Sequence, residues 1–266
     1  MTATLALLAA VEALADEAAA LILEVYATDF AVQGKADASP VTVADERAEA
    51  HIVAGLRRLT PGVPVVAEEA VARGEVPATG ACFWLVDPLD GTREFVSRNG
   101  EFTVNIALVE DGAPVLGVVQ VPVQRRRYGG VVGQGAWCDD AGGRRAIACR
   151  AVPAVGGLVV ASSRSHGDEA ALEAWLAGQG LAGRPLTHRP AGSSLKFGLV
   201  ATGEADLYPR LGRTMEWDTA AGHAVLRAAG GEVCTLDGHP LAYGKPGFEN
   251  PHFVARGPAS DPGRAG

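Results

Sequence analysis

The chain has 266 residues, of which 48% are hydrophobic and 20% charged, and its formal net charge is −8. This composition is that of a folded globular protein, and the length suits one large domain or two small ones that share a core. The acidic balance disfavours a nucleic-acid partner, because binding to a phosphate backbone rests on a basic surface. Small anionic substrates stay open, since bound divalent cations can dominate the local field.

The first 25 residues are rich in Ala and Leu but carry four acidic side chains and no basic one. This pattern favours an amphipathic helix over a signal peptide or an integral membrane segment. The four cysteines show no CxxC or zinc-type spacing, so we expect free thiols in a cytoplasmic protein. Peripheral association with the inner membrane, and the choice between monomer and homodimer, stay open.

After this helix, residues 33–40 are predicted to be a polar loop. A second helix is expected to start near Asp45 and to end near Leu59, where Thr60-Pro61-Gly62 closes it. Apolar and β-rich runs follow, with a hairpin signal at Asp111-Gly112. They predict strands over residues 63–67, 81–86, 102–110, 114–122 and 126–132. The first half is therefore expected to pack helices on a largely antiparallel sheet.

From about residue 155 the pattern changes to alternating strands and helices. We predict strands over residues 158–162, 205–208 and 232–235, and helices over residues 168–177, 193–201 and 216–229. The chain is accordingly divided into an N-terminal α+β domain, 1–154, and a C-terminal α/β domain, 155–256. Residues 257–266 lack apolar anchors and are expected to be a disordered tail.

Asp87 and Asp90 follow directly on the apolar run Phe83-Trp-Leu-Val86. Carboxylates at the end of a buried strand project towards a loop region where ligands gather, and two of them three residues apart can bind a hard cation. Gly91 and Thr92 then offer backbone N–H groups to an anion at a predicted helix start. The alternative is an ordinary turn with Asp at favoured positions.

Three further acidic positions have equally plain alternatives. Glu68-Glu69 follows the strand over residues 63–67 and could be a solvated turn. Asp45 and Asp218 lie near predicted helix starts, where the helix dipole favours a carboxylate without any function. Each signal alone is weak, and the hypothesis of a shared metal site rests on their combination.

In order and spacing these motifs resemble the inositol monophosphatase superfamily of Mg²⁺-dependent, lithium-sensitive phosphatases. The resemblance extends from about residue 35 to residue 250, with a less recognisable stretch at residues 70–80. It is carried by Thr42-Val-Ala-Asp45, Glu68-Glu69, Trp84-Leu-Val-Asp-Pro-Leu-Asp-Gly-Thr92 and Trp217-Asp-Thr-Ala-Ala-Gly222. Segments 98–107, 192–197 and 207–210 look like the bacterial 3′(2′),5′-bisphosphate nucleotidases of this superfamily.

The resemblance implies a layered αβαβα sugar-phosphatase fold, with residues 1–154 as the metal-binding domain. It implies two or three Mg²⁺ ions held by the side chains of Glu68, Asp87, Asp90 and Asp218 and the carbonyl of Leu89. Asp45 and Thr92 would be catalytic and orient the attacking water. Substrate contacts are implied for Glu68, Leu89, Asp90, Gly91, Thr92, Ser193, Ser194, Lys196, Arg210 and Asp218.

The expected reaction is hydrolysis of the 3′-phosphate of adenosine 3′,5′-bisphosphate, with 3′-phosphoadenosine 5′-phosphosulfate as a second candidate substrate. The resemblance associates this activity with sulfate assimilation. Inositol 1-phosphate or fructose 1,6-bisphosphate remains an alternative, because substrate choice in one fold is set by peripheral residues. A non-catalytic metal- or phosphate-binding module is a further alternative, although simple binding would not require a water-orienting pair. An acidic interaction domain with incidental carboxylates is the last.

Overall fold

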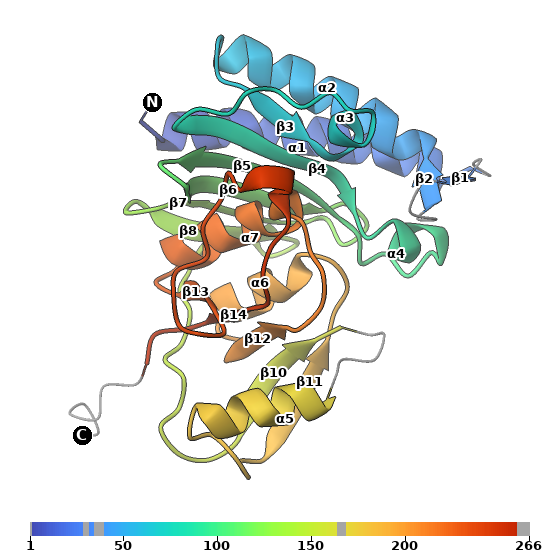
Figure 1. Ribbon diagram of the computed structural model, residues 1–266. Coiled ribbons are helices and arrows are strands. Elements are labelled where there is room, and N and C mark those ends of the chain that lie inside the picture. The colour runs from blue at the N-terminus through green and yellow to red at the C-terminus, as the bar shows by residue number, and fades with distance from the viewer. Residues whose placement is uncertain (1, 29–31, 35–39, 164–168, 260–266) are drawn as a thin grey trace.

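The computed structural model describes residues 2–28, 32–34, 40–163 and 169–259. Two β-sheets alternate with three layers of helices (Figure 1). The predicted αβαβα architecture is therefore confirmed. Within the described residues, no helix is long and apolar enough to cross a membrane.

The first sheet has seven strands in sequence order, and every neighbouring pair is antiparallel except β3 and β4. Its central strands are buried on both faces, which explains why they form continuous apolar runs in the sequence. On β4, Phe83 and Leu85 face one core while Trp84 and Val86 face another. The strands are β3 Val65–Ala67, β4 Cys82–Asp90, β5 Thr103–Glu110, β6 Ala113–Val121, β7 Arg126–Val131, β8 Gly135–Asp140 and β9 Gly143–Ile147.

Two long helices, α1 (Leu5–Tyr26) and α2 (Val43–Leu59), cover the outer face of this sheet. The Thr4 hydroxyl caps α1 by accepting the N–H of Leu7 at 3.1 Å. One apolar side of each helix packs on the sheet, as the leucine spacing predicts. Two short strands, β1 (Val32–Gly34) and β2 (Pro40–Thr42), pair between the helices, and residues 35–39 of the predicted loop lie outside the described residues.

The second sheet has the strand order β11-β10-β12-β14-β13. Its β10 is parallel to β11 and β12, whereas β14 pairs antiparallel with β12 and β13. Helix α5 (Glu169–Gly178) packs Leu172 and Leu176 against its outer face. The strands are β10 Leu158–Ser162, β11 Leu186–Pro190, β12 Leu207–Arg210, β13 Glu232–Thr235 and β14 Phe253–Arg256.

Helices α6 (Leu195–Ala201) and α7 (Glu216–Ala228) form the middle layer and join the two sheets through one core. Phe197 of α6 packs edge-on against Tyr208 of β12 and is stacked with Phe253 of β14. The proposed division near residue 154 follows the passage of the chain from one sheet to the next, and it stays a prediction. The shared core shows why the two halves are not packed separately.

Besides β1 and β2, four strands were not predicted, and their sequences explain why. Strand β9 is almost entirely exposed and β11 is a polar edge strand, so neither carries a period-two apolar pattern. Strands β8 and β14 lie inside the two sheets, between β7 and β9 and between β12 and β13, but outside the runs that the sequence marked. Residues 257–259, expected to belong to a disordered tail, instead pair with the segment at Val152, whose N–H donates to Pro258 O at 2.9 Å. Residues 260–266 lie outside the described residues.

Gly117 sets the distance between the first sheet and the middle layer. A Cβ at this position of β6 would collide with the Ala221 carbonyl oxygen of α7 and would lie 2.8 Å from Ala224 Cβ. Because the first of these neighbours is backbone, the helix as a whole would have to move. We therefore predict that Gly117→Ala lowers the free energy of unfolding by about 1–3 kcal/mol in denaturant titrations. Gly178→Ala at the end of α5, where a Cβ meets open space, is the control and should cause no loss.

Candidate functional site

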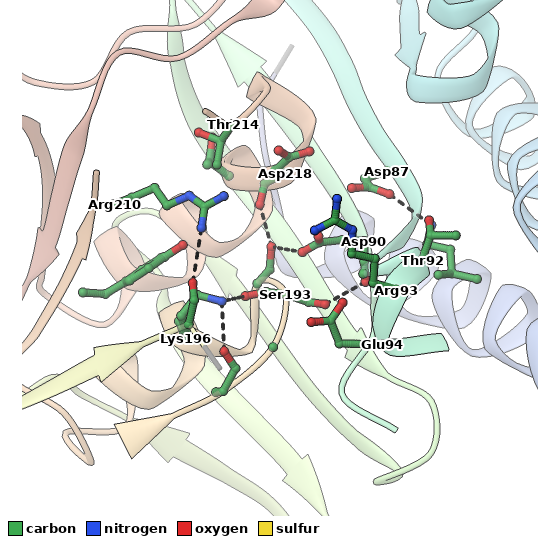
Figure 2. Close-up of a pocket in the computed structure, with 18 of the residues that line it drawn as sticks. Asp87, Asp90, Thr92, Arg93, Glu94, Ser193, Lys196, Arg210, Thr214 and Asp218 are labelled. Carbon is green, nitrogen blue, oxygen red and sulfur yellow. Dashed lines mark hydrogen bonds between the residues drawn. The ribbon is translucent and has the colours of Figure 1, made fainter. Parts of the chain in front are cut away.

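A cavity of about 350 Å³ opens where α4, α6 and α7 meet the ends of β4 and β12. Most of the carboxylates lie along one side of it together with Arg93, and the cations Lys196 and Arg210 lie along the other (Figure 2). The cavity is lined by Glu68, Asp87, Leu89, Asp90, Gly91, Thr92, Arg93, Glu94, Ser163, Ala191, Gly192, Ser193, Ser194, Lys196, Tyr208, Arg210, Thr214, Asp218 and Thr219. Every predicted site residue except Asp45 is therefore brought to one place.

A bulge in β4 turns Asp87 and Asp90 to the same face of the sheet. Residues three apart in a regular strand point to opposite faces. Here Asp87 pairs with Asn105 and Asp90 with Thr103, so β4 contains one residue more than β5 between the two pairs. Pro88, which has no N–H to donate, lies inside the irregular stretch. The sequence had indicated a turn after Val86, whereas the strand continues to Asp90.

Gly91 and the short helix α4 (Thr92–Val96) follow on this bulge, as the predicted helix start requires. Gly91 is left-handed, with φ 94°, and a Cβ there would collide with the Ser193 hydroxyl oxygen. Phe95 anchors α4 through ring contacts with Tyr26 and Phe102, at centroid distances of 5.1 Å each. The N–H groups of the first turn of α4 are thus fixed beside the carboxylates.

One oxygen of each of three carboxylates is tied to the protein. Asp87 Oδ1 accepts the N–H of Leu89 at 3.0 Å, and Asp218 Oδ2 accepts the N–H of Met215 at 2.8 Å. Asp90 Oδ2 lies 3.0 Å from the Ser194 hydroxyl. Within the described part of the chain, the protein hydrogen bonds to these three carboxylates are accepted by the named oxygens and not by the other oxygen of the same carboxylate. The second oxygen of each carboxylate is left for a ligand.

Burial and mutual repulsion raise the pKa of two of these groups. The pKa of Asp87 is well above its ordinary value, first because the side chain is buried and then because Glu68 and Asp90 lie close. The pKa of Asp218 is also raised, again by burial first and by Asp90 second. Asp45 does not line the cavity: it is buried on α2 behind the carboxylates, and its charge contributes to the rise at Asp87.

The loop from Ala191 to Ser194 connects the two halves at the cavity. The Ser193 hydroxyl donates to Asp90 O at 2.8 Å, and Gly192 N–H donates to Glu101 Oε2 at 2.8 Å. The Ser194 hydroxyl lies 2.5 Å from the Asp218 carbonyl oxygen and accepts from Asn105 Nδ2 at 3.0 Å. The predicted substrate-facing serines therefore also bind the segments that carry Asp90 and Asp218.

Lys196 is almost fully buried, not on a solvated helix face. Its ammonium donates to Ala191 O at 3.1 Å and to Ser193 O at 2.6 Å, and it lies 5.3 Å from the centre of the Tyr208 ring. Burial lowers the pKa of Lys196 to about 8, although the charge of Asp90 opposes this shift. The side chain thus braces the 191–194 loop, and the predicted contact with a nucleotide phosphate stays a prediction.

The sequence and the architecture have known counterparts. Residues 5–258 match the inositol monophosphatase family. The 3′(2′),5′-bisphosphate nucleotidase CysQ of Escherichia coli K12 is 50% identical over 244 residues, which cover 90% of this chain and 95% of that protein. This chain belongs to the inositol monophosphatase family.

Solved structures of the family agree with this assignment. CysQ from Bacteroides thetaiotaomicron superposes with a TM-score of 0.78 at 38% identity, covering 96% of this chain and 98% of that one. An inositol monophosphatase from Anabaena superposes with a TM-score of 0.73 at 26% identity, covering 96% and 91%. The resemblance seen in the sequence is therefore confirmed.

The donor set in this family member suits Mg²⁺. All the candidate ligands are oxygens, and two of them are buried carboxylates with raised pKa values, as expected where a cation belongs. Among the described residues, no three acidic, histidine or cysteine side chains converge on a single point. Mg²⁺ does not need such a cage, because it retains waters and binds through one or two carboxylates plus substrate phosphate.

Several side chains of the site were not singled out from the sequence. Thr103 and Asn105 are completely buried on β5 and lie 3.4 and 3.5 Å from Asp90 Oδ2. Their only sequence signal was their place in the family-like segment 98–107. Tyr208 and Thr219 also line the cavity, and their sequence signal was likewise their place in the family-like segments 207–210 and 217–222.

The raised carboxylate pKa values predict how Mg²⁺ and pH act together on stability. A carboxyl group whose folded pKa exceeds its unfolded value of about 4 stabilises the metal-free protein at low pH. That contribution is lost as the pH rises through the folded pKa. Mg²⁺ bound at this site would require the ionised groups, so its binding should release protons and raise the thermal unfolding midpoint more at mildly alkaline than at mildly acidic pH.

Thermal unfolding with and without Mg²⁺ at several pH values measures this effect. Asp87→Asn removes a buried ionisable group and provides the check. The metal-free variant should lose less stability than the wild type as the pH rises, and its gain from Mg²⁺ should be smaller. A gain from Mg²⁺ that is equal at all pH values in the wild type would contradict the prediction.

Proposed function

We propose that this chain is a Mg²⁺-dependent 3′(2′),5′-bisphosphate nucleotidase that converts adenosine 3′,5′-bisphosphate to AMP and phosphate. The observation that carries the proposal is the 50% identity to Escherichia coli CysQ over 95% of that protein's length. The division of the cavity into an acidic and a basic side supports it (Figure 2). 3′-Phosphoadenosine 5′-phosphosulfate is the second candidate substrate. Inositol 1-phosphate and fructose 1,6-bisphosphate are less favoured.

The acidic side would hold the metal ions. Glu68, Asp87, Asp90 and Asp218, with the Leu89 carbonyl, would be the ligands, and each of the three aspartates has one oxygen already oriented by the protein. Bound Mg²⁺ would neutralise charge on the phosphoryl oxygens and make a water molecule a better nucleophile. The number of ions, two or three, belongs to this proposal.

The protein itself would supply orientation. The Thr92 hydroxyl, at the first residue of α4, would orient the attacking water. The same role for the Asp45 carboxylate rests on the family resemblance alone, because Asp45 does not line the cavity. The N–H groups of Gly91 and Thr92 would bind the phosphoryl oxygens, because the first N–H groups of a helix have no partner inside it. No side chain would form a covalent bond to phosphorus, so one water attack completes hydrolysis.

The basic side would bind the rest of the nucleotide. Arg210 Nη1 donates to Ser163 Oγ at 3.3 Å and Nη2 to Arg213 O at 3.0 Å, while its buried Nε has no acceptor among the described residues. A partly satisfied guanidinium in a cavity favours an anionic ligand. We assign the second phosphate of the substrate to this side, with Ser193 and Lys196 beside it. A cytoplasmic location is part of the proposal.

Turnover of three substrates tests the proposal. Adenosine 3′,5′-bisphosphate, inositol 1-phosphate and fructose 1,6-bisphosphate are compared with and without Mg²⁺ by phosphate release. We expect the nucleotide to have the highest kcat/KM and the activity to vanish without the metal. Asp90→Asn should lose at least about 100-fold in kcat while its circular dichroism and thermal midpoint show an intact fold. A preference for either sugar phosphate would refute the nucleotide assignment.

Arg210→Ala tests the basic side. Loss of a charge-assisted contact to the second phosphate should raise KM for adenosine 3′,5′-bisphosphate about 10-fold or more. KM for inositol 1-phosphate, which lacks that phosphate, should change little. Arg213→Ala is the control, because this exposed side chain pairs with Glu249 instead of entering the cavity. An equal rise in KM for both substrates would argue against a second phosphate at Arg210.

A further inference from the structure

The helix that carries Glu68 has no side-chain cap at its N-terminus. Helix α3 (Glu68–Ala72) begins immediately after β3, and its N-cap residue, Ala67, is extended and gives no side-chain hydrogen bond. The first N–H groups of any helix lack partners inside it, so they need an acceptor from elsewhere. Because α3 has only five residues, the orientation of its first residue, Glu68, depends on the contacts that hold its first turn in place.

Glu49 of α2 supplies the acceptor. Its carboxylate is only 4% exposed, and Oε2 accepts the N–H of Glu69 at 2.7 Å. Its other oxygen, Oε1, accepts from Arg73 Nη2 at 3.2 Å. Because Arg73 is the C-cap residue of α3, one carboxylate holds both ends of this helix. Glu68, the residue immediately before Glu69, lines the cavity.

Glu49 also lies one helical turn after Asp45 on α2, and both side chains are buried. Residues four apart share a helix face, so α2 presents both carboxylates to the same side of the molecule. The first contributes to the field at Asp87 and the second holds the backbone beside Glu68. Helix α2 thus fixes the position of Asp45 relative to the segment that carries Glu68.

We propose that Glu49 is a positioning residue for the metal centre: by capping α3 it holds Glu68 in the orientation that binds Mg²⁺. The inference rests on the proposed function, in which Glu68 is a metal ligand. Outer contacts of this kind are worth on the order of 10- to 100-fold in metal affinity. A role confined to fold stability would instead change the unfolding midpoint and leave the affinity for Mg²⁺ unchanged.

Three substitutions at Glu49 separate the parts of this role. Glu49→Ala removes the acceptor, Glu49→Asp keeps the charge but shortens the reach by one methylene, and Glu49→Gln keeps an amide oxygen at the same distance. The control is Glu46→Ala, which removes an exposed carboxylate from the same helix. Mg²⁺ affinity is measured by titration calorimetry on the full chain without substrate, alongside metal-free thermal midpoints and the Mg²⁺ dependence of kcat.

We expect Glu49→Ala and Glu49→Asp to weaken Mg²⁺ binding at least about 10-fold. Saturating Mg²⁺ should restore most of kcat in both. Glu46→Ala should bind Mg²⁺ within about 2-fold of the wild type. Glu49→Gln retains one acceptor oxygen for the Glu69 N–H but turns an NH2 donor towards Arg73 in place of the second oxygen, so its Mg²⁺ affinity should lie between those of the wild type and Glu49→Ala.

Unchanged Mg²⁺ affinity in Glu49→Ala, with only a lower thermal midpoint, would overturn the inference and leave the proposed function intact. If Glu49→Ala does not fold, wild-type affinity in Glu49→Asp overturns it equally. A wild-type protein that binds no Mg²⁺ would overturn the metal centre itself, and the inference with it.

Discussion

The constraint on which the structure depends is the assembly of carboxylates in one cavity despite their mutual repulsion. Asp87, Asp90 and Asp218 come from two segments far apart in the sequence, and burial makes ionisation of Asp87 and Asp218 still more costly. The fold offsets this by orienting hydrogen-bond donors towards the carboxylates, namely the N–H groups of Leu89 and Met215 and the Ser194 hydroxyl. These donors come from β4, from the residue before α6 and from the residue before α7, so both halves of the chain contribute to their placement.

The layered arrangement follows from that requirement. Helix α7 carries Asp218 at its first turn and lies in the core shared by the two sheets, while Asp87 and Asp90 project from the bulge of β4. The 191–194 loop then crosses from the second half to the first and is bound at both sides. A cavity built in this way is sensitive to the spacing between layers, which residues such as Gly117 set.

The long helices and buried strands could be predicted because their patterns are local. The apolar stripe of α1 and the continuous run before Asp87 are properties of neighbouring residues. The bulge in β4 could not be predicted, since it depends on how β4 aligns with β5 and not on β4 alone. The burial of Lys196 could not be predicted either. The sequence of a short helix is the same whether the ammonium of its lysine is exposed to solvent or donates to the carbonyls of a folded loop. The family motifs identified most of the site residues, but the cap that Glu49 provides is a contact between distant segments and leaves no motif.

The position of β14 has a consequence for the order in which the protein is completed. The first sheet consists of residues between Val65 and Ile147, all of which are synthesised before the second sheet begins. Strand β14, the last of the chain's strands in the structure, lies between β12 and β13, and Phe253 pairs with Arg210. During synthesis from the N-terminus, the strand that carries Arg210 therefore gains its second neighbour only when residues 253–256 become available. The strand that carries Asp87 and Asp90 therefore has its sheet well before the strand that carries Arg210, and a chain released early would hold the first sheet but lack the sheet that supports Arg210.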